Sequence, residues 1–223
     1  MCNAYNVTTN ADAVIALVKG WRQARRKSNQ DILPGIFPNY RAPILRLEEG
    51  DLVLDDAVWG MPTPVEHLVT KTGKPMSYDR GITNIRKTYV DHWRRWLGVE
   101  HRCLVPFTMF SEPDEKHRNH YFEFADGRPV GLLAGIFDTH SRQIRAKDEA
   151  PTAGQFYAFL TTEPNAEVKP IHAKAMPVIL TEPEDWETWL TADWSTAKKL
   201  QRALPDGLLK STPFGAPSDV VPA

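Results

Sequence analysis

The run His101-Arg102-Cys103-Leu104-Val105-Pro106-Phe107-Thr108-Met109-Phe110-Ser111-Glu112 carries the most informative pattern of the chain. Apolar and β-prone residues fill positions 102–106 and predict a strand, which a turn follows. Glu112 comes directly after this apolar stretch, so we expect its carboxylate to be partly buried. A buried carboxylate needs a partner, because burying an unpaired charge is costly. Glu112 could serve in proton transfer, or it could simply cap the next turn.

Similar short β-prone runs, bounded by turn residues, lie on both sides of this stretch. They cover 2–8, 44–47, 52–59, 121–124, 131–137, 155–162 and 176–180. Proline accounts for 18 of the 223 residues, which favours many turns and short elements over a helical bundle. The pattern predicts one sheet system in a single α+β domain.

Helical spacing of apolar residues, or a capping pattern, predicts four helices. They are expected after a cap at Thr9 or Asn10, over 85–97, from the Thr181 capping box, and from Ser195. The basic cluster within 22–27 is expected to extend the end of the first helix, where cations offset the helix dipole.

The composition excludes several classes of protein. Lys and Arg number 27 against 28 Asp and Glu, so the net charge is −1 and any nucleic-acid site must be a local patch. No apolar run approaches the roughly 20 residues of a membrane span, and residues 1–5 lack the features of a signal peptide. We therefore expect a cytoplasmic protein without a membrane partner. The domain is predicted over 1–211, with a loose tail over 212–223.

Cys2 stands directly after the initiator methionine. Removal of Met1 would leave an N-terminal cysteine, whose α-amine and thiol have reference pKa values of about 7.7–8.0 and about 8.5. This 1,2-aminothiol can condense with an aldehyde and close to a thiazolidine, or attack an acyl group as an N-terminal nucleophile. A small residue at position 2 is also common without any such role, so Cys2 alone is a weak indication.

His172 is the histidine with the most informative setting, at the mouth of the strand predicted over 176–180. It could act as a general acid or base, or be a structural histidine. The two cysteines, Cys2 and Cys103, are too far apart for a disulfide framework, and no spacing matches a metal motif. We predict neither a metal nor a cofactor, and we interpret Cys103 as a buried small hydrophobic residue.

Several segments together form a recognisable order along the chain. They are Met1-Cys2-Asn3-Ala4, Pro38-Asn39-Tyr40-Arg41-Ala42-Pro43, Trp59-Gly60-Met61-Pro62, Asn84-Ile85-Arg86-Lys87-Thr88, the run 101–112, Ala134-Gly135-Ile136-Phe137, Thr161-Thr162 and Ile171-His172-Ala173-Lys174-Ala175-Met176-Pro177. Their order and spacing resemble the SRAP family, the SOS response-associated peptidases or abasic-site processing proteins. The most specific part, 101–112, resembles the family's Arg-Arg-Cys-Leu-x-Pro-Ala-x-Gly-Phe-Tyr-Glu, with Cys, Leu, Pro and Glu in register.

The chain departs from the family pattern in segments that the family uses to hold DNA. Asn3 and Ala4 replace Gly and Arg, Thr88 replaces Glu, and Met109 replaces Gly. Lys174 replaces an Arg, with one extra residue before Met-Pro. Because lysine is a point charge and not a bidentate fork, we expect weaker or relocated phosphate contacts.

The resemblance implies a reactive set of Cys2, Asn84, Glu112 and His172. In this hypothesis the α-amine of Cys2 attacks the open aldehyde of an abasic site in single-stranded DNA, and the thiolate closes a thiazolidine cross-link. Glu112 would accept or hold the amine proton, and His172 would protonate the sugar oxygen. Asn84 would orient the sugar by hydrogen bonds.

The resemblance also suggests which residues surround the DNA. Arg86 is the candidate phosphate ligand, and Trp59, Asn39, Tyr40 and Lys174 are further candidates for the groove. The implied fold is a curved, barrel-like, mainly antiparallel β core flanked by helices. The implied setting is the SOS and DNA damage response, with the protein acting as a monomer.

Two other functions would use the same residues. Cys2 could be the nucleophile of a peptidase, a hydrolase that cleaves only its own Met1 or other chains as well. The chain could also be a non-catalytic DNA-binding module. Turnover of unrelated peptides would favour the peptidase, whereas an adduct with an abasic oligonucleotide would favour aldehyde capture.

Overall fold

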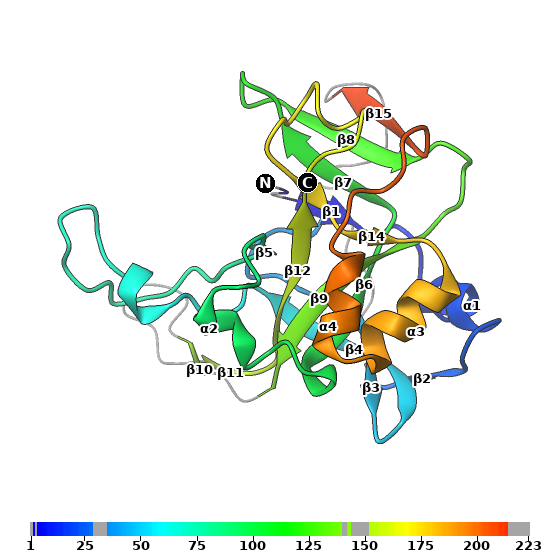
Figure 1. The fold of residues 1–223 in the computed structure, drawn as a ribbon, viewed down its shortest axis with the longest axis horizontal. Helices are drawn as coiled ribbons and strands as arrows, with labels where there is room; N and C mark the ends of the chain where they lie inside the picture. The colour runs from blue at the N-terminus through cyan, green and yellow to red at the C-terminus, as the bar shows by residue number, and fades with distance from the viewer. Residues whose placement is uncertain (1, 3, 29–34, 140–141, 144–151, 214–223) are drawn as a thin grey trace.

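The computed structural model describes residues 2, 4–28, 35–139, 142–143 and 152–213. The strands are β1 (Ala4–Asn6), β2 (Ala24–Arg26), β3 (Arg41–Glu48), β4 (Asp51–Trp59), β5 (Asn84–Ile85), β6 (Arg102–Phe107), β7 (Met109–Pro113), β8 (Asn119–Phe124), β9 (Gly131–Asp138), β10 (Arg142–Gln143), β11 (Thr152–Ala153), β12 (Phe156–Thr162), β13 (Met176–Pro177), β14 (Ile179–Leu180) and β15 (Leu209–Pro213). The helices are α1 (Ala11–Val18), α2 (Asp91–Arg94), α3 (Pro183–Thr191) and α4 (Trp194–Ala197), with 3₁₀ turns at Val65–His67, Val99–His101 and Lys198–Leu200. This mostly antiparallel architecture confirms the predicted α+β class (Figure 1).

The larger sheet bends into a ring. Its strands follow the order β13-β12-β4-β3-β6-β9-β14, and β12 pairs with β9 as well as with β4, which closes the path. Every residue of β6, β9 and β12 is buried. Strands buried on both faces read as continuous apolar runs, which is why these three were visible in the sequence. The curved core expected from the resemblance is therefore present as a ring-like sheet.

The second sheet has the strand order β1-β7-β8-β15. The run 101–112 passes from β6 in the ring into β7 in this second sheet. After β6 the chain passes through Thr108, whose backbone N–H donates to the carbonyl of Asn6 at 2.7 Å, and then enters β7. The predicted turn before Glu112 is therefore wrong: residues 109–113 are a strand. Pairing with β1 on one side and β8 on the other stabilises this strand.

Two helix predictions are corrected in their extent. α1 begins after the Asn10 cap and ends at Val18. The basic cluster does not extend this helix, because residues 24–26 form β2 beside β4. In the segment 85–97 only Asp91–Arg94 is α-helical, since Ile85 pairs with β12 and Tyr89 is 73% exposed. The apolar spacing there did not mark one continuous buried face.

The C-terminal helices form near the predicted positions, but the Thr181 capping box is wrong: α3 follows Glu182 without a side-chain cap, and α4 begins at Trp194 after the Asp193 cap. α3 attaches to the ring. The indole N–H of Trp189 in α3 contacts the carbonyl oxygens of Cys103 in β6 at 2.9 Å and Gly135 in β9 at 3.2 Å. The described chain ends within β15, which pairs with β8 as far as Pro213. Thr212 and Pro213 are thus paired, and the rest of the predicted tail lies outside the described residues. No helix of the described part is long and apolar enough to cross a membrane.

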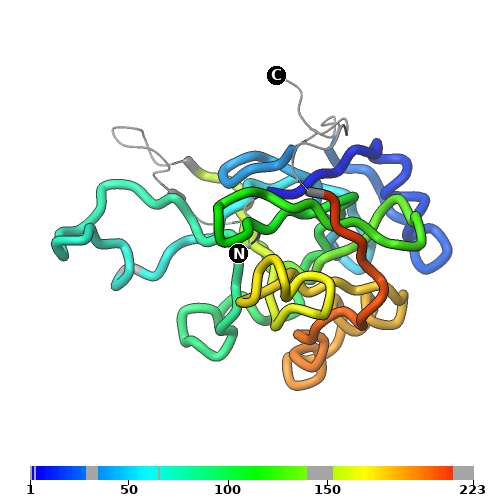
Figure 2. The backbone as a smooth tube through the Cα atoms, turned by 90° about the horizontal axis from the view of Figure 1, so that it is seen from above, coloured from blue at the N-terminus to red at the C-terminus, as the bar shows by residue number. Residues whose placement is uncertain are grey.

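An arm formed by residues 61–83 extends away from the two sheets (Figure 2). Its two sides are joined by bridges between Met61 and Ile82 and between Val69 and Pro75. The arm returns directly into β5, so it begins and ends beside the ring.

Candidate functional site

β1 brings the N-terminal cysteine against the strand that carries Glu112. Ala4 pairs with Ser111, the neighbour of Glu112, and the Ser111 hydroxyl donates to the Ala4 carbonyl at 3.2 Å. The Cys2 thiol donates to the same carbonyl at 3.2 Å. Cys2 is only 1% exposed, so its sulfur faces the protein interior.

Asn84 lies on the other side of Cys2 and contacts it directly. Its side-chain Nδ2 donates to the Cys2 carbonyl at 2.9 Å and to the Thr83 hydroxyl at 2.8 Å. The position follows from the pairing of β5 with β12, which sets Asn84 opposite Phe159. Asn84 therefore ties the residue-2 backbone to the ring.

Glu112 and His172 meet beside the cysteine. His172 Nδ1 lies 3.3 Å from Glu112 Oε2 and 2.9 Å from the carbonyl oxygen of Ala175. The Glu112 side chain is fully buried, and that of His172 is 14% exposed. With Nδ1 donating to Ala175, Nε2 is the acceptor nitrogen of the neutral ring.

Burial shifts the pKa values of the three titratable side chains in this predicted set, Cys2, Glu112 and His172. It raises the pKa of Glu112 to about 7 and lowers the pKa of His172 below its usual range, although the Ala175 hydrogen bond opposes the latter shift. Burial first, and the Glu112 carboxylate second, raise the pKa of the Cys2 thiol well above its usual value. Near neutral pH the site thus holds a protonated thiol beside a carboxyl close to half-ionised. Such a set can accept and return protons next to a nucleophile.

The four reactive residues predicted from the sequence come from segments far apart in the chain. Cys2 precedes β1, Asn84 begins β5, Glu112 lies in β7 and His172 lies between β12 and β13. The contacts above join Asn84 to Cys2 and His172 to Glu112, and the β1–β7 pairing joins the two pairs. Within the described residues, no group of His, Cys, Asp or Glu side chains is arranged to hold a metal ion.

A family model described as SOS response associated peptidase (SRAP) matches residues 1–214. The chain belongs to the SRAP family. This confirms the resemblance drawn from the sequence segments, and the match covers all four reactive positions. No curated protein matches the chain in a direct search.

Solved structures similar to this SRAP chain share its fold over nearly the whole length. A protein from Bordetella bronchiseptica is 21% identical, covers 96% of this chain and 100% of its own, and has a TM-score of 0.67. A protein from Bacteroides thetaiotaomicron is 20% identical, with 95% and 91% covered and a TM-score of 0.69. A phage-related protein from Bordetella bronchiseptica is 17% identical, with 96% and 95% covered and a TM-score of 0.64. At these identities the likeness concerns the fold alone.

The SRAP residues predicted to contact DNA occupy different environments. Arg86 directly follows β5, has a 41% exposed side chain, and pairs with Glu163 at 3.0 Å. Lys174 is exposed, two residues after His172. Asn39 and Tyr40 are exposed in a turn beside β4.

Trp59 is fully buried, unlike the other residues predicted for the groove. Its indole stacks on Phe159 with ring centroids 5.2 Å apart, and its N–H donates to the carbonyl of Thr83 at 3.0 Å. In this position Trp59 supports the residue before Asn84 from within the protein. A direct contact of its ring with DNA would need the ring to leave this environment.

Sequence reasoning missed a polar contact inside the SRAP core. Tyr5 in β1 and Tyr157 in β12 are both fully buried, and their hydroxyls hydrogen-bond to each other. Burial raises the pKa of both phenols, so both remain protonated. Two isolated tyrosines in apolar strands give no sign that they meet, because Tyr5 belongs to the second sheet and Tyr157 to the ring, and only the packing of the two sheets brings them together.

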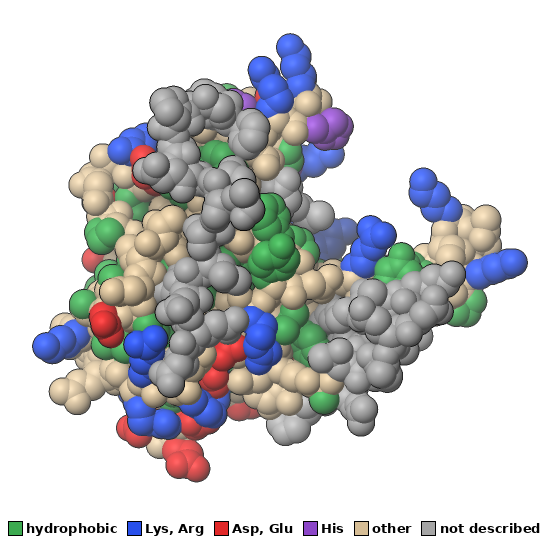
Figure 3. Space-filling model, turned by 180° about the vertical axis from the view of Figure 1, so that it is seen from behind, with side chains coloured by type: hydrophobic (Ala, Val, Ile, Leu, Met, Phe, Trp, Pro, Cys, Tyr) green, Lys and Arg blue, Asp and Glu red, His purple; other side chains and the backbone are tan. Residues whose placement is uncertain are grey.

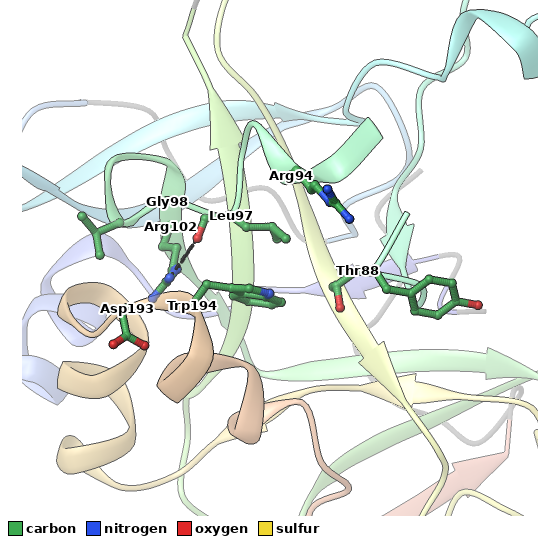
Figure 4. A pocket seen from close by; sticks show the side chains of 9 residues that line it. Thr88, Arg94, Leu97, Gly98, Arg102, Asp193 and Trp194 are labelled. Atoms are coloured by element: carbon green, nitrogen blue, oxygen red, sulfur yellow. Dashed lines mark hydrogen bonds between the residues drawn. The ribbon is translucent and has the colours of Figure 1, made fainter. Parts of the chain in front are cut away.

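A separate pocket of about 470 Å³ lies between α2 and α4 (Figure 4). Arg102 forms part of its lining and is 1% exposed, with its guanidinium donating to the carbonyls of Leu97, Trp189 and Ala192. None of the predicted site residues lines this pocket. Arg102 therefore joins the end of α3 to the loop at Leu97, which precedes β6, and it is not part of the cysteine site.

Proposed function

We propose that this SRAP protein captures abasic sites in single-stranded DNA by forming a thiazolidine between its N-terminal cysteine and the sugar aldehyde. The observation that carries the proposal is the grouping of Cys2, Asn84, Glu112 and His172 through the contacts described above. A thiol beside two proton-exchanging groups and an amide that fixes its backbone suits covalent capture of an electrophilic carbon. Cross-linking in this way would protect the lesion.

Met1 must first be removed, because the nitrogen of Cys2 is otherwise an amide and not a nucleophile. The freed amine then adds to the aldehyde carbon, and water leaves to give a Schiff base. Sγ adds to the imine carbon while the thiol proton passes to nitrogen. One C–N bond and one C–S bond form, one water is released, and no oxidant is needed.

The surrounding groups would each assist one proton movement. Ionised Glu112 accepts a proton from the amine or the thiol of Cys2. The carboxylate is buried close to the sulfur, and burial raises its pKa and so makes it a stronger base. His172 protonates the ring oxygen of the closed sugar and so opens it to the aldehyde. The Glu112 carboxylate, 3.3 Å from Nδ1, stabilises the charged imidazole that this step requires.

A local basic surface supports a DNA partner despite the net charge of −1. Lys and Arg side chains stand on two projections either side of a hollow (Figure 3). One projection is the β7–β8 hairpin with exposed Lys116 and with Arg118, which is paired with Asp114 at 2.7 Å. The other is the 61–83 arm with exposed Lys71 and Lys74. Such flanking cations suit the backbone of a single strand.

Intact-protein mass spectrometry tests the proposal. The purified chain should lack Met1 and, after incubation with an oligonucleotide carrying one abasic site, should gain the oligonucleotide mass minus one water. Cys2→Ala should give no such adduct, whereas Cys103→Ala, which removes the other and fully buried thiol, should still give it. An adduct on the Cys2→Ala protein would contradict the assignment.

The same preparation examines the peptidase alternative. A thiol beside a proton acceptor could also attack the Met1 carbonyl, and self-processing of this kind is compatible with aldehyde capture. Loss of Met1 without an adduct, together with repeated cleavage of unrelated peptides, would favour a peptidase instead. Retained Met1 would mean that the aminothiol does not form.

A further inference from the structure

Two aromatic side chains are exposed together on the turn before β3. Phe37 is 48% exposed and Tyr40 is 46% exposed, and their ring centroids lie 5.7 Å apart at an interplanar angle of 71°. Large aromatic rings normally gain free energy from burial, so an exposed pair suggests a surface that a flat apolar partner covers.

The backbone holds this pair in a fixed arrangement. The N–H of Tyr40 donates to the Phe37 carbonyl at 3.0 Å, Pro38 follows Phe37, and Asn39 has a φ of 71°. These are the features of a type II β-turn, which has proline at its second position and a positive φ at its third. Phe37 and Tyr40 are the first and last residues of the turn.

Hydrogen bonds attach the turn to β1, which follows Cys2, and to the end of β4. Ile36 exchanges backbone hydrogen bonds of 3.2 and 2.7 Å with Tyr5 of β1 in an antiparallel bridge. The chain direction in that bridge runs from Ile36 toward the N-terminal end of β1, which is the end that carries Cys2. Asn39 and Tyr40 also bond to the backbone of Trp59 at 2.9 Å each.

We propose that Phe37 and Tyr40 form a stacking platform for the unpaired base next to an abasic sugar held at Cys2. This inference rests on the proposed function. An abasic site leaves its neighbouring base without one stacking partner, and an aromatic side chain can take that place. Every base has a π face, so the platform accepts any neighbouring base.

The experiment is a binding cycle with a tetrahydrofuran abasic analogue, which has no aldehyde and cannot cross-link. One oligonucleotide carries the analogue with normal neighbours, and two others also lack the base on its 5′ or its 3′ side. Fluorescence anisotropy gives the affinity of each for the wild-type protein and for Phe37→Ala, Tyr40→Ala and Tyr40→Phe.

We expect removal of the base on one side to weaken wild-type binding by about 5- to 140-fold, the usual range for base–aromatic stacking. Phe37→Ala and Tyr40→Ala should bind the normal oligonucleotide more weakly and lose little more when that base is removed. Tyr40→Phe keeps the ring and should retain the wild-type ratio. Tyr89→Ala, which removes an aromatic ring that is 73% exposed on another turn, is the matched control and should also retain it.

The platform is overturned if Phe37→Ala and Tyr40→Ala keep the wild-type affinity ratio for the bases on both sides. Because the analogue cannot react, this outcome is separate from a failure of cross-linking. Failure of the proposed function would appear as missing adducts on a true abasic site with the wild-type protein. Thermal unfolding of each variant confirms that the substituted turn is folded.

Discussion

Glu112 shows how burial of one residue couples stability to pH. Burial raises the pKa of its carboxyl to about 7, compared with about 4.3 for an exposed glutamate. Between these two values the folded protein keeps a proton that the unfolded chain releases, so the free energy of unfolding falls as pH rises through this window. Above the folded-state pKa, the loss in free energy of unfolding has reached its full size.

Glu112→Gln should remove this pH dependence, because glutamine has a similar shape and no charge. We expect the variant to be more stable than wild type at pH 8 by on the order of 3–4 kcal/mol, with a much smaller difference at pH 4.5. Urea unfolding at both pH values measures the two free energies. If the variant and wild-type free energies of unfolding differ by the same amount at pH 4.5 and pH 8, the pKa of Glu112 is not raised by folding.

At the residue scale, the sequence indicated the burial of Glu112 but not the residue that Glu112 contacts. Burial of Glu112 followed from the apolar run before it, and Cys2 followed from its place after Met1. The contact of Glu112 with His172 joins residues 60 positions apart and depends on how two sheets meet. Periodicity describes neighbours along the chain, so it cannot identify such a pair.

At the scale of elements, β9 is paired between β6 and β12, and their close packing leaves no space for a side chain at Gly135. A Cβ there would lie 2.9 Å from Cys103 Sγ, 2.9 Å from Val105 Cγ2 and 3.3 Å from the Ala158 carbonyl oxygen. These distances are shorter than ordinary van der Waals contacts, so the Cys103 and Val105 side chains or the strands that carry them would have to shift.

Gly135→Ala should therefore destabilise the protein by about 1–3 kcal/mol, the usual cost of overpacking a core. Adding Cys103→Ala removes the sulfur and should relieve part of that loss, although Val105 and the Ala158 carbonyl remain close. Chemical denaturation of the two single variants and the double variant gives the coupling. Unchanged stability of Gly135→Ala would contradict the close approach.

Among the elements, long buried strands were predictable and short paired ones were not. β3, β4, β6, β9 and β12 carry continuous or alternating apolar patterns. β2 and β5 span only three and two residues, and they exist because an adjacent strand offers free backbone groups. Pairing of this kind is a tertiary effect that local propensity does not encode.

At the scale of the whole molecule, the proposed DNA site concentrates cations on a chain with a net charge of −1. We predict that log affinity for single-stranded DNA falls linearly with log salt, and that Arg86→Ala lowers the magnitude of the slope by about 0.7, the value for one phosphate contact. Arg128→Ala, which removes a cation paired with Asp126 at the far turn of β8, should leave the slope unchanged. Equal slopes for wild type and Arg86→Ala would remove Arg86 from the interface.

The whole fold was the least accessible level from residue patterns alone. Strand content indicated an α+β domain, but closure of the ring depends on β12 pairing with both β4 and β9. The family resemblance supplied the curved core that the patterns could not. The resemblance named Asn39 and Tyr40 as groove candidates, but only the structure shows that Phe37 and Tyr40 are exposed together on one turn.

The three-residue strand β1 also determines how the protein would bear a mechanical load. A DNA strand joined to Cys2 would pull along the axis of β1, whose hydrogen bonds to β7 and to Ile36 run across that axis. Tension in this direction loads these bonds in shear, so they share the force and do not open one after another. The strand that follows the proposed attachment point is thus held on both sides by neighbouring chain segments.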